Sequence, residues 1–320
     1  MNLLASLRYL VALQEHRHFG RAAQSCHITQ PALSNALRAL EEEFGAVIVK
    51  RGRTFAGFTP EGDRVLASAR VMLRERELLQ QELDSEAGRP QGSLSIGAVP
   101  TAVPLAARFA AMLQARHPGI LPVVRSMSSP EIEAGLDEMT LDMGLGYTDR
   151  LGERGIKLSV VSQYIERYFL VRRAPRAGKD GIQLGGTTTW KDAATQPLCL
   201  LTPEMHNRTI VDSAFAMAGM TVKPVIETNS ILTLALSVVA GEVSSILPGA
   251  LVSAVRGYGE LEAIALIHPE LQTPIGFMMA QTERPSRTLD AAMSLARDAI
   301  WIEHARLHSG SLSAAAPVSA

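Results

Sequence analysis

The sequence predicts an α/β chain in which an N-terminal winged helix-turn-helix and a linker helix precede a larger domain of alternating strands and helices. Three observations lead to this prediction. Residues 1–58 contain short amphipathic helices joined by a tight turn and followed by a basic loop. A long amphipathic helix is expected over residues 59–87. From residue 92 to 308, strand-like and helical periodicities alternate, which is typical of mainly parallel sheets covered by helices.

Size and composition fit a protein of two or three domains. The 320 residues are 47% hydrophobic and 20% charged, with a formal net charge of −1, so any nucleic-acid binding must depend on local basic clusters. Two cysteines far apart, Cys26 and Cys199, predict a reducing compartment without a disulfide framework. The start of the chain lacks a secretion signal and no apolar run is long enough to span a bilayer, so we expect a cytoplasmic protein with no membrane partner.

The strongest pattern in the chain is that of a DNA-binding helix-turn-helix. Small residues at Ala22 and Ala23 let a second helix cross closely, and the second helix carries leucines on one face and polar residues on the other. Asn and Gln side chains can make paired hydrogen bonds to an adenine edge, and Arg can reach a guanine or a phosphate. From this segment we expect DNA contacts by Thr29, Gln30, Pro31, Ser34, Asn35 and Arg38.

A basic, glycine-containing loop after these helices predicts a hairpin wing. Lys50, Arg51 and Arg53 lie in it, with no acidic residue nearby, and are expected to hold phosphates or enter the minor groove. The alternative is a protein-interaction module whose charges are merely solvated. The order of tight turn, exposed polar helix start and basic wing favours DNA binding.

The predicted linker helix has a clear start and an apolar seam. Thr59 can cap it, Pro60 suits its first turn and Glu61 complements its dipole. The seam consists of Val65, Ala69, Met72, Leu79 and Leu83. The helix can pack on its own domain or pair with the same helix of a second copy, and we favour pairing because little flanking sequence can cover it.

Beyond residue 92 the periodicity predicts two α/β lobes. Lobe I is expected over 92–163 and 266–308, lobe II over 164–265, and a disordered tail over 309–320. The predicted strands are 93–99, 120–127, 141–146, 167–172, 198–201, 221–227, 243–247 and 275–280. The predicted helices are 104–116, 130–139, 206–218, 231–240 and 287–304.

Several positions of the first 62 residues together resemble the helix-turn-helix signature of LysR-type transcriptional regulators. They are Ala22-Ala23, Thr29-Gln30-Pro31-Ala32-Leu33-Ser34, Leu40-Glu41, Gly45, Arg51, Arg53 and Thr59-Pro60-Glu61-Gly62. The resemblance implies paired winged helices on DNA, usually in a tetramer assembled from dimers, and an effector domain with the periplasmic-binding-protein fold. Two departures are Ile48-Val49, where the family usually has Leu-Phe, and Asn35, where many members have arginine.

The resemblance places an effector site between the two lobes. Ligands of open α/β sheets bind beyond the carboxyl ends of strands, where helix starts offer N–H groups to anions. The expected effector-binding residues are Pro100, Thr101, Ser128, Ser129, Tyr147, Thr202, Pro203, Asn229 and Ser230, with Arg125 and His206 as further candidates. Each can equally be a plain helix cap. We expect a small organic anion, such as a carboxylate, and no other cofactor.

No catalytic pattern is found in the sequence. It has no nucleophile elbow, phosphate-binding loop or metal-ligand spacing, so we expect neither an enzyme nor a metal site. A solute receptor shares the two-lobed core but has no use for residues 1–62. The expected partners are double-stranded promoter DNA, further copies of the chain and the effector, with RNA polymerase as another candidate.

Overall fold

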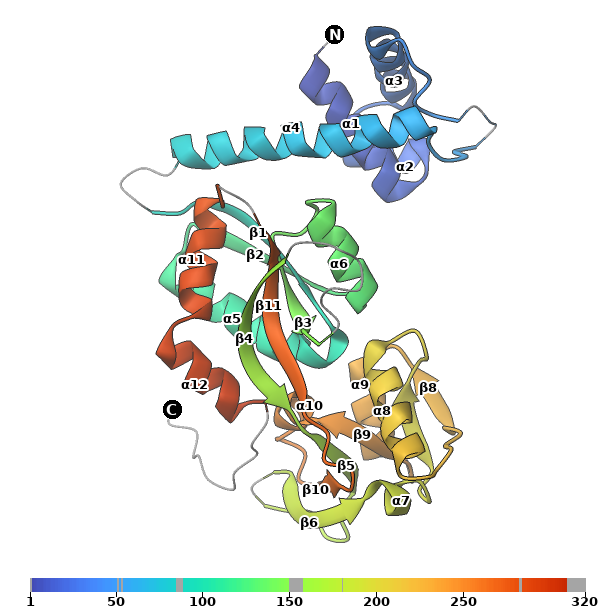
Figure 1. Cartoon of the computed structure of the whole chain (residues 1–320), viewed down its shortest axis with the longest axis vertical. Helices are drawn as coiled ribbons and strands as arrows, with labels where there is room; N and C mark the ends of the chain where they lie inside the picture. Colours follow the sequence, from blue (N-terminus) through green and yellow to red (C-terminus); the bar gives the residue numbers. More distant parts are fainter. Residues whose placement is uncertain are drawn as a thin grey trace. The chain divides into compact units, whose positions relative to one another are not determined.

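The computed structural model of the protein describes residues 2–50, 52, 54–84, 89–149, 158–179, 181–281 and 284–309. These residues form two compact units, a helical N-terminal unit and an α/β unit that begins at Arg89 (Figure 1). Within the described ranges, no helix combines the length and the apolar character needed to cross a membrane.

The N-terminal unit is built from four helices: α1 (Leu3–His16), α2 (Phe19–Ser25), α3 (Gln30–Phe44) and α4 (Pro60–Asp84). Apolar residues recur on one face of each of the first three helices, and these faces meet in a common core. Fully buried members of that core include Leu10, Leu13, Leu33, Leu40 and Ile48.

The helix ends of this unit have recognisable caps. His18 precedes α2, and its Nδ1 atom accepts the backbone N–H groups of Gly20 at 3.1 Å and Arg21 at 3.3 Å. Gly45 ends α3 with a φ of 61°, a left-handed conformation that glycine adopts without steric cost. These caps fix the short turns that hold the helices at their crossing.

The segment between α3 and α4 forms the wing, whose base is tied to α3. Val49 and Phe58 form an antiparallel β-bridge. The carboxylate of Glu41 on α3 accepts the N–H groups of Ile48 at 2.8 Å and Val49 at 3.0 Å. The hairpin pairing predicted for the wing is therefore limited, among the described residues, to this bridge and its neighbours.

Gly62 lets the first turn of α4 pack directly on the base of the wing. A Cβ atom at this position would lie 2.1 Å from the carbonyl oxygen of Ile48, which no side chain can tolerate without a backbone shift. Thr59 caps the helix by accepting the N–H of Gly62 at 2.9 Å. These contacts give a structural reason for the threonine and the glycine at the two ends of the run from Thr59 to Gly62.

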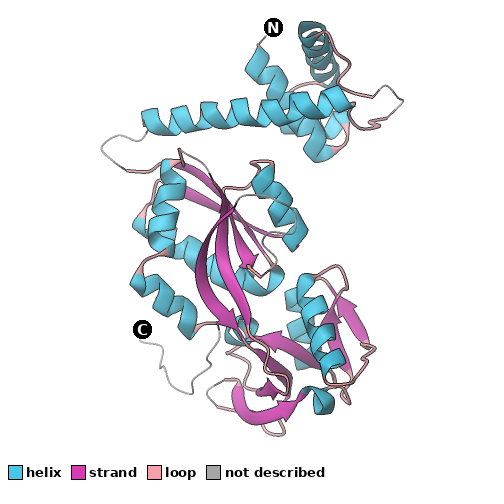
Figure 2. Ribbon diagram, viewed as in Figure 1, coloured by secondary structure: helices cyan, strands magenta, loops and turns pink. Residues whose placement is uncertain are grey.

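The α/β unit contains two mixed sheets, which define the two lobes (Figure 2). Lobe I has the strand order β2-β1-β3-β11-β4, and lobe II has the order β6-β10-β5-β9-β7-β8. The strands of lobe I are β1 (Gly92–Ala98), β2 (Ile120–Ser126), β3 (Met143–Tyr147), β4 (Leu158–Glu166) and β11 (Thr273–Ala280). Those of lobe II are β5 (Tyr168–Arg173), β6 (Gln183–Thr189), β7 (Leu198–Leu201), β8 (Ile226–Thr228), β9 (Ser244–Pro248) and β10 (Leu261–Ile267).

Helices cover both sheets and enclose separate cores. Lobe I carries η2 (Pro100–Ala102), α5 (Val103–Arg116), α6 (Ser129–Asp137), α11 (Arg287–Ala296) and α12 (Ala299–Leu307). Lobe II carries α7 (Trp190–Ala193), α8 (His206–Met217), α9 (Ile231–Ala240) and α10 (Gly249–Ala254). In lobe I the ring of Phe109 lies 4.5 Å from that of Phe277, and in lobe II Trp190 lies 5.1 Å from Phe215.

The chain passes between the lobes twice, at Arg167 between β4 and β5 and over residues 268–272 between β10 and β11. The lobe boundaries expected after residues 163 and 265 fall inside β4 and β10 respectively, because neither strand was predicted from the sequence. The order of two lobes with a return to the first agrees with the predicted fold class.

Some elements differ from those predicted or were missed. β4, β6 and β10 were not predicted, and the strand expected over 221–227 is only β8. The helix expected over 287–304 is two helices, because Asp298 caps α12 by accepting the N–H of Ile300 at 2.8 Å. The linker helix expected over 59–87 is α4, and the predicted tail 309–320 lies, except for Ser309, outside the described residues.

Candidate functional site

The first candidate site is the exposed face of α3. Thr29 caps this helix by accepting the N–H of Ala32 at 3.3 Å, and Pro31 occupies its first turn. Leu33 and Leu40 face the core, so the opposite face of the helix is left for solvent or a partner.

The polar residues predicted to contact DNA lie on this exposed face. Thr29, Gln30, Pro31, Asn35 and Arg38 are exposed, whereas Ser34 is half-buried. Their side chains are therefore available to a ligand that lies along the amino-terminal half of α3. That is the arrangement of a recognition helix in a major groove.

The wing adds basic character next to this helix in sequence. Lys50 is exposed, and its backbone N–H donates to the carbonyl of Gly57 at 3.0 Å. Arg51 and Arg53, which were predicted to contact DNA, lie outside the described residues.

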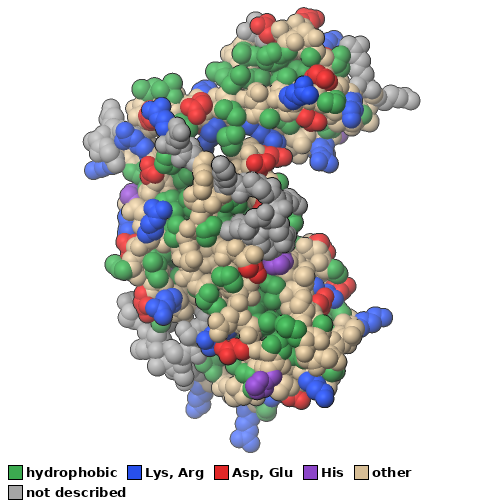
Figure 3. All heavy atoms as spheres, viewed as in Figure 1, with side chains coloured by type: hydrophobic (Ala, Val, Ile, Leu, Met, Phe, Trp, Pro, Cys, Tyr) green, Lys and Arg blue, Asp and Glu red, His purple; other side chains and the backbone are tan. Residues whose placement is uncertain are grey.

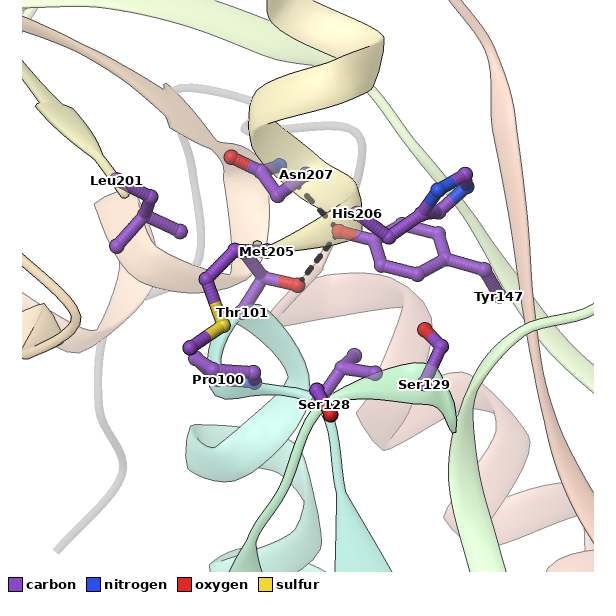
Figure 4. Close-up of a pocket in the computed structure, with 10 residues that line it drawn as sticks. Pro100, Thr101, Ser128, Ser129, Tyr147, Leu201, Met205, His206 and Asn207 are labelled. Atoms are coloured by element: carbon purple, nitrogen blue, oxygen red, sulfur yellow. Dashed lines mark hydrogen bonds between the residues drawn. The ribbon is translucent and has the colours of Figure 1, made fainter. Parts of the chain in front are cut away.

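The second candidate site is a small cavity between the two lobes that is partly open to solvent. Lobe I contributes the start of η2, the β2–α6 connection and the end of β3, and lobe II contributes the end of β7 and the start of α8 (Figure 4). The lining residues are Val99, Pro100, Thr101, Ser128, Ser129, Tyr147, Leu201, Met205, His206 and Asn207. None is Asp, Glu, Lys or Arg.

A hydrogen-bonded group at the centre of the cavity joins the lobes. The Thr101 hydroxyl lies 2.9 Å from the Tyr147 hydroxyl, and Nδ2 of Asn207 donates to the same Tyr147 oxygen at 3.3 Å (Figure 4). The Tyr147 ring also lies edge-on to that of His206, with centroids 4.9 Å apart. Burial is the main cause of the raised pKa of Tyr147, and the nearby carboxyl of Glu166 raises it further. The Tyr147 hydroxyl therefore stays protonated.

The helix starts at the cavity differ in how they are capped. The Ser128 hydroxyl and N–H both bond Oε2 of Glu131 at 2.8 Å, so Ser128 serves the start of α6. Ser129 is only 7% exposed, and its hydroxyl has no hydrogen-bond partner among the described residues. The start of α8 has no side-chain cap at Met205. Ser129 and the start of α8 are therefore suited to a polar ligand.

The structure brings five of the nine predicted effector-binding residues to one cavity, and leaves four elsewhere. The cavity has Pro100, Thr101, Ser128, Ser129 and Tyr147 in its wall, together with the further candidate His206. Thr202, Pro203, Asn229 and Ser230 do not line it, and Arg125 is exposed outside it.

Local bonds account for two of the four that lie elsewhere. The Thr202 hydroxyl donates to Glu204 at 2.7 Å, and Ser230 caps α9 by accepting the N–H of Thr233 at 3.3 Å. For Ser230 the helix-cap interpretation is the better one. Sequence reasoning missed Met205 and Asn207, although both flank His206 at the start of a predicted helix.

The two cysteines lie away from this cavity. Cys199 is fully buried in β7, and burial raises the pKa of its thiol. Cys26 is half-buried at the end of α2. Over the described part of the chain no group of three or more His, Cys, Asp or Glu side chains is placed to hold a metal ion.

Comparison with known protein families identifies both parts of the chain. The description "LysR substrate binding domain" matches residues 87–301, and "Bacterial regulatory helix-turn-helix protein, lysR family" matches residues 4–63. The chain belongs to the LysR family. This confirms the family that the sequence motif predicted.

Curated relatives match part of the chain. The hydrogen peroxide-inducible genes activator of Pectobacterium carotovorum subsp. carotovorum is 36% identical over 143 residues, which are 44% of this chain and 47% of the relative. The DNA-binding transcriptional dual regulator OxyR of Escherichia coli K12 is 37% identical over 140 residues, 43% of this chain and 46% of the relative. The chain thus spans about half the length of these relatives.

Solved structures match nearly the whole chain and show its fold. A full-length OxyR variant from Pseudomonas aeruginosa has a TM-score of 0.66 at 22% identity and covers 91% of this chain and 96% of its own. CbnR complexed with its target DNA has a TM-score of 0.62 at 20% identity, and the match covers 94% of this chain and 99% of the CbnR chain. The curated relatives are named as an activator and as a DNA-binding regulator, in agreement with the prediction that the chain is not an enzyme.

Proposed function

We propose that this protein is a transcription regulator that binds promoter DNA through paired winged helix-turn-helix units and responds to a small organic anion bound between its lobes. One observation supports the DNA-binding role above all. The helix α3 has a buried leucine face and exposes Gln30, Asn35 and Arg38 on the other side. The likeness to CbnR, solved with its target DNA, adds support.

Pairing through α4 supplies the two DNA-binding units that such a regulator needs. Of the predicted seam, Ala69 is fully buried, whereas Met72, Leu79 and Leu83 are exposed to 43%, 56% and 68%. Figure 3 shows hydrophobic side chains among Lys and Arg at the surface of the N-terminal unit. A second copy of α4 covers this seam in the proposed dimer, and two dimers form the proposed tetramer.

The cavity is suited to a small polar ligand. Its wall has no formal charge apart from any on His206, and it offers hydroxyl, amide and imidazole groups. Three helices, η2, α6 and α8, begin with residues of this wall, and N–H groups at helix starts favour anions. We therefore favour a small carboxylate as the effector.

Peroxide is the alternative that the names of the relatives raise. A peroxide response through a thiol needs an accessible cysteine of lowered pKa. In this chain Cys199 is buried with a raised pKa, and neither Cys26 nor Cys199 lines the cavity. The burial of Cys199 and the position of both cysteines outside the cavity favour non-covalent binding of an effector over oxidation of a thiol.

Regulation by a bound effector requires that the ligand prefer one arrangement of the protein. Thr101 and Tyr147 belong to lobe I, and Asn207 belongs to lobe II. A ligand that takes part in this bonded group selects the arrangement of the lobes that suits it. In the proposed mechanism the change reaches DNA through the spacing of paired N-terminal units.

The proposal also covers the location of the protein, its cofactors and a further partner. We propose a cytoplasmic protein without a resident cofactor, with RNA polymerase as a further partner at the promoter. These proposals follow from the expected work of a bacterial DNA-binding regulator.

Fluorescence anisotropy with purified full-length protein tests the proposal. A labelled duplex from the region upstream of its own gene should bind more tightly than a scrambled duplex of equal length, and a carboxylate that raises the melting temperature should change that binding. Equal affinity for both duplexes would rule out specific promoter binding. A carboxylate series without effect on melting or on DNA binding would rule out the anion.

A further inference from the structure

Glu166 is a fully buried acidic residue at the junction of the two lobes. It is the last residue of β4 and stands directly before Arg167, where the chain passes into lobe II. Its side chain has no exposed surface. In the antiparallel register it lies opposite Thr273, the first residue of β11 after the second passage. Glu166 therefore lies beside both connections between the lobes.

Hydroxyl groups surround the carboxyl of Glu166. Those of Thr101, Tyr147, Tyr164 and Tyr168 lie near enough to affect its pKa, and they come from η2, β3, β4 and β5. Tyr168 also lies 3.4 Å from the hydroxyl of Thr273. Thr101 and Tyr147 belong at the same time to the wall of the cavity. The carboxyl is thus one layer of side chains behind the effector cavity.

Among the residues that the structure describes, no cation pairs with this carboxyl. Arg167 pairs with Glu270 at 3.5 Å, and both side chains of that pair are about half exposed. Within the described part of the chain, the other titratable groups near the cluster are the three tyrosines, His206 beside Tyr147, and Asp149, which acts on Tyr168.

Burial without a counter-charge favours the neutral form of a carboxyl. Burial raises the pKa of Glu166 to about 8, although the surrounding hydroxyls act in the opposite direction. Neither of its oxygens has a hydrogen bond of normal geometry among the described residues. The side chain is therefore protonated at neutral pH.

We propose that Glu166 determines which charge an effector may carry: it holds a proton behind the cavity, and an anionic effector binds only while that proton is retained. The proposal rests on the role of the cavity as an effector site. A neutral carboxyl does not repel a carboxylate ligand, whereas an ionised one in the same low-dielectric surroundings does. Glu166 is thus a specificity-determining residue that acts through Thr101 and Tyr147.

Isosteric probes of different charge test this proposal on the full-length protein. Benzoate and benzamide have similar shapes, and benzoate stays ionised between about pH 6.5 and about pH 9.5. Benzoate affinity of the wild type, measured by calorimetry, should fall at least about tenfold over this range, while benzamide affinity stays level. In Glu166→Gln the benzoate affinity should change much less than in the wild type, because Gln is neutral throughout.

Glu270→Gln is the matched control, because Glu270 lies near the same junction but is exposed and paired with Arg167. It should keep the wild-type pH dependence. Benzoate binding by the wild type that does not depend on pH would overturn the proposal, as would an equal dependence in Glu166→Gln. If Glu166→Gln does not fold, the benzoate and benzamide profiles of the wild type still decide.

A second measurement needs no ligand and separates this proposal from the effector proposal. The infrared difference spectrum between wild type and Glu166→Gln at neutral pH should show the carbonyl band of one protonated carboxyl group. Absence of that band would overturn the proposal whatever binds in the cavity. If the band is present and no carboxylate binds at any pH, the anionic effector is wrong and the protonated state of Glu166 is supported.

Discussion

The recognition surface of α3 and the cavity between the lobes are assembled in opposite ways. The polar side chains of α3 come from one helix, are largely exposed and lie opposite a buried leucine face. The polar side chains of the cavity come from four separate segments of two lobes. Thr101, Tyr147 and Asn207 among them are buried and bonded to one another.

This difference predicts how the two regions respond to substitution. An exposed side chain such as Asn35 has little part in the folded state, so its loss should change binding and leave stability nearly unaltered. The cavity groups satisfy one another's hydrogen bonds, so a substitution there affects both ligand binding and stability. Substitutions of the two kinds can show whether this division is correct.

The largest effect is expected from pH at Glu166. Its pKa is about 8 when folded against an ordinary value of 4.5, so the folded state retains a proton that the unfolded chain loses. The associated stability is fully present below about pH 4.5, falls as the pH rises and is lost by about pH 8, a change on the order of 5 kcal/mol. The free energy of unfolding, measured with denaturant at several pH values, should show this fall in the wild type and not in Glu166→Gln. Parallel pH profiles of the two proteins would contradict the prediction.

The next largest effect is expected in the core beneath the recognition helix. Leu40→Ala removes a fully buried side chain and should lower the free energy of unfolding of the N-terminal unit by about 2–5 kcal/mol. DNA binding should fall with it, while ligand-induced stabilisation of the α/β unit persists. Met72→Ala, at an exposed position of α4, is the control and should leave the unit's own stability within about 0.5 kcal/mol. Loss of ligand binding in Leu40→Ala would show that the two regions are not separable.

Asn35→Ala should change specificity more than affinity. Loss of a paired hydrogen bond to a base costs about 1–3 kcal/mol of discrimination, so the ratio of affinities for promoter and scrambled duplexes should shrink at least about fivefold. Lys50→Ala should weaken binding to both duplexes equally and reduce the salt slope by about 1, because a phosphate contact reads no sequence. If Asn35→Ala weakens both duplexes equally, Asn35 does not read a base.

Among the buried positions, the smallest effect on stability is expected in the cavity. Thr101→Val removes the hydroxyl that lies 2.9 Å from Tyr147 and should cost on the order of 1 kcal/mol of unfolding free energy. The response of DNA binding to an effector should be lost, with basal DNA binding retained. Thr202→Val, outside the cavity, is the control and should keep the response. An unchanged response in Thr101→Val would place the effector elsewhere.

The N-terminal unit could be predicted well because its signals are local. The spacing of Leu33, Leu37 and Leu40 gives the buried face of α3, and Thr29 and Pro31 give its start. The same pattern identified the polar residues on the opposite face. Packing partners beyond the next helix were not needed for this prediction.

The α/β unit was harder to predict because part of its core is polar. β4 contains the buried side chains of Gln163 and Glu166, which break the alternation expected of a strand. Gln163 is buried because its Nε2 donates to the carbonyl of Ala296 at 3.1 Å and its Oε1 accepts from Trp301. A partner more than a hundred residues away in sequence leaves no local signal.

The cavity was predicted only in part for a related reason. Polar residues after strands were good candidates, but only those whose strands end at the lobe junction reach the cavity. Ser129 and Ser230 both stand at the start of a helix in the sequence, yet Ser129 lines the cavity and Ser230 caps α9. The three-dimensional course of the strands decides between these two outcomes, and it is not visible in a short motif.

The most direct test of the regulator proposal is the affinity of the full-length protein for its own upstream DNA relative to a scrambled duplex, measured by anisotropy at fixed salt with and without a stabilising carboxylate. The expected ratio is at least about a thousandfold, and it should change when the carboxylate is present. Equal affinity for both duplexes, unaffected by any carboxylate, would contradict both the role of α3 and that of the cavity.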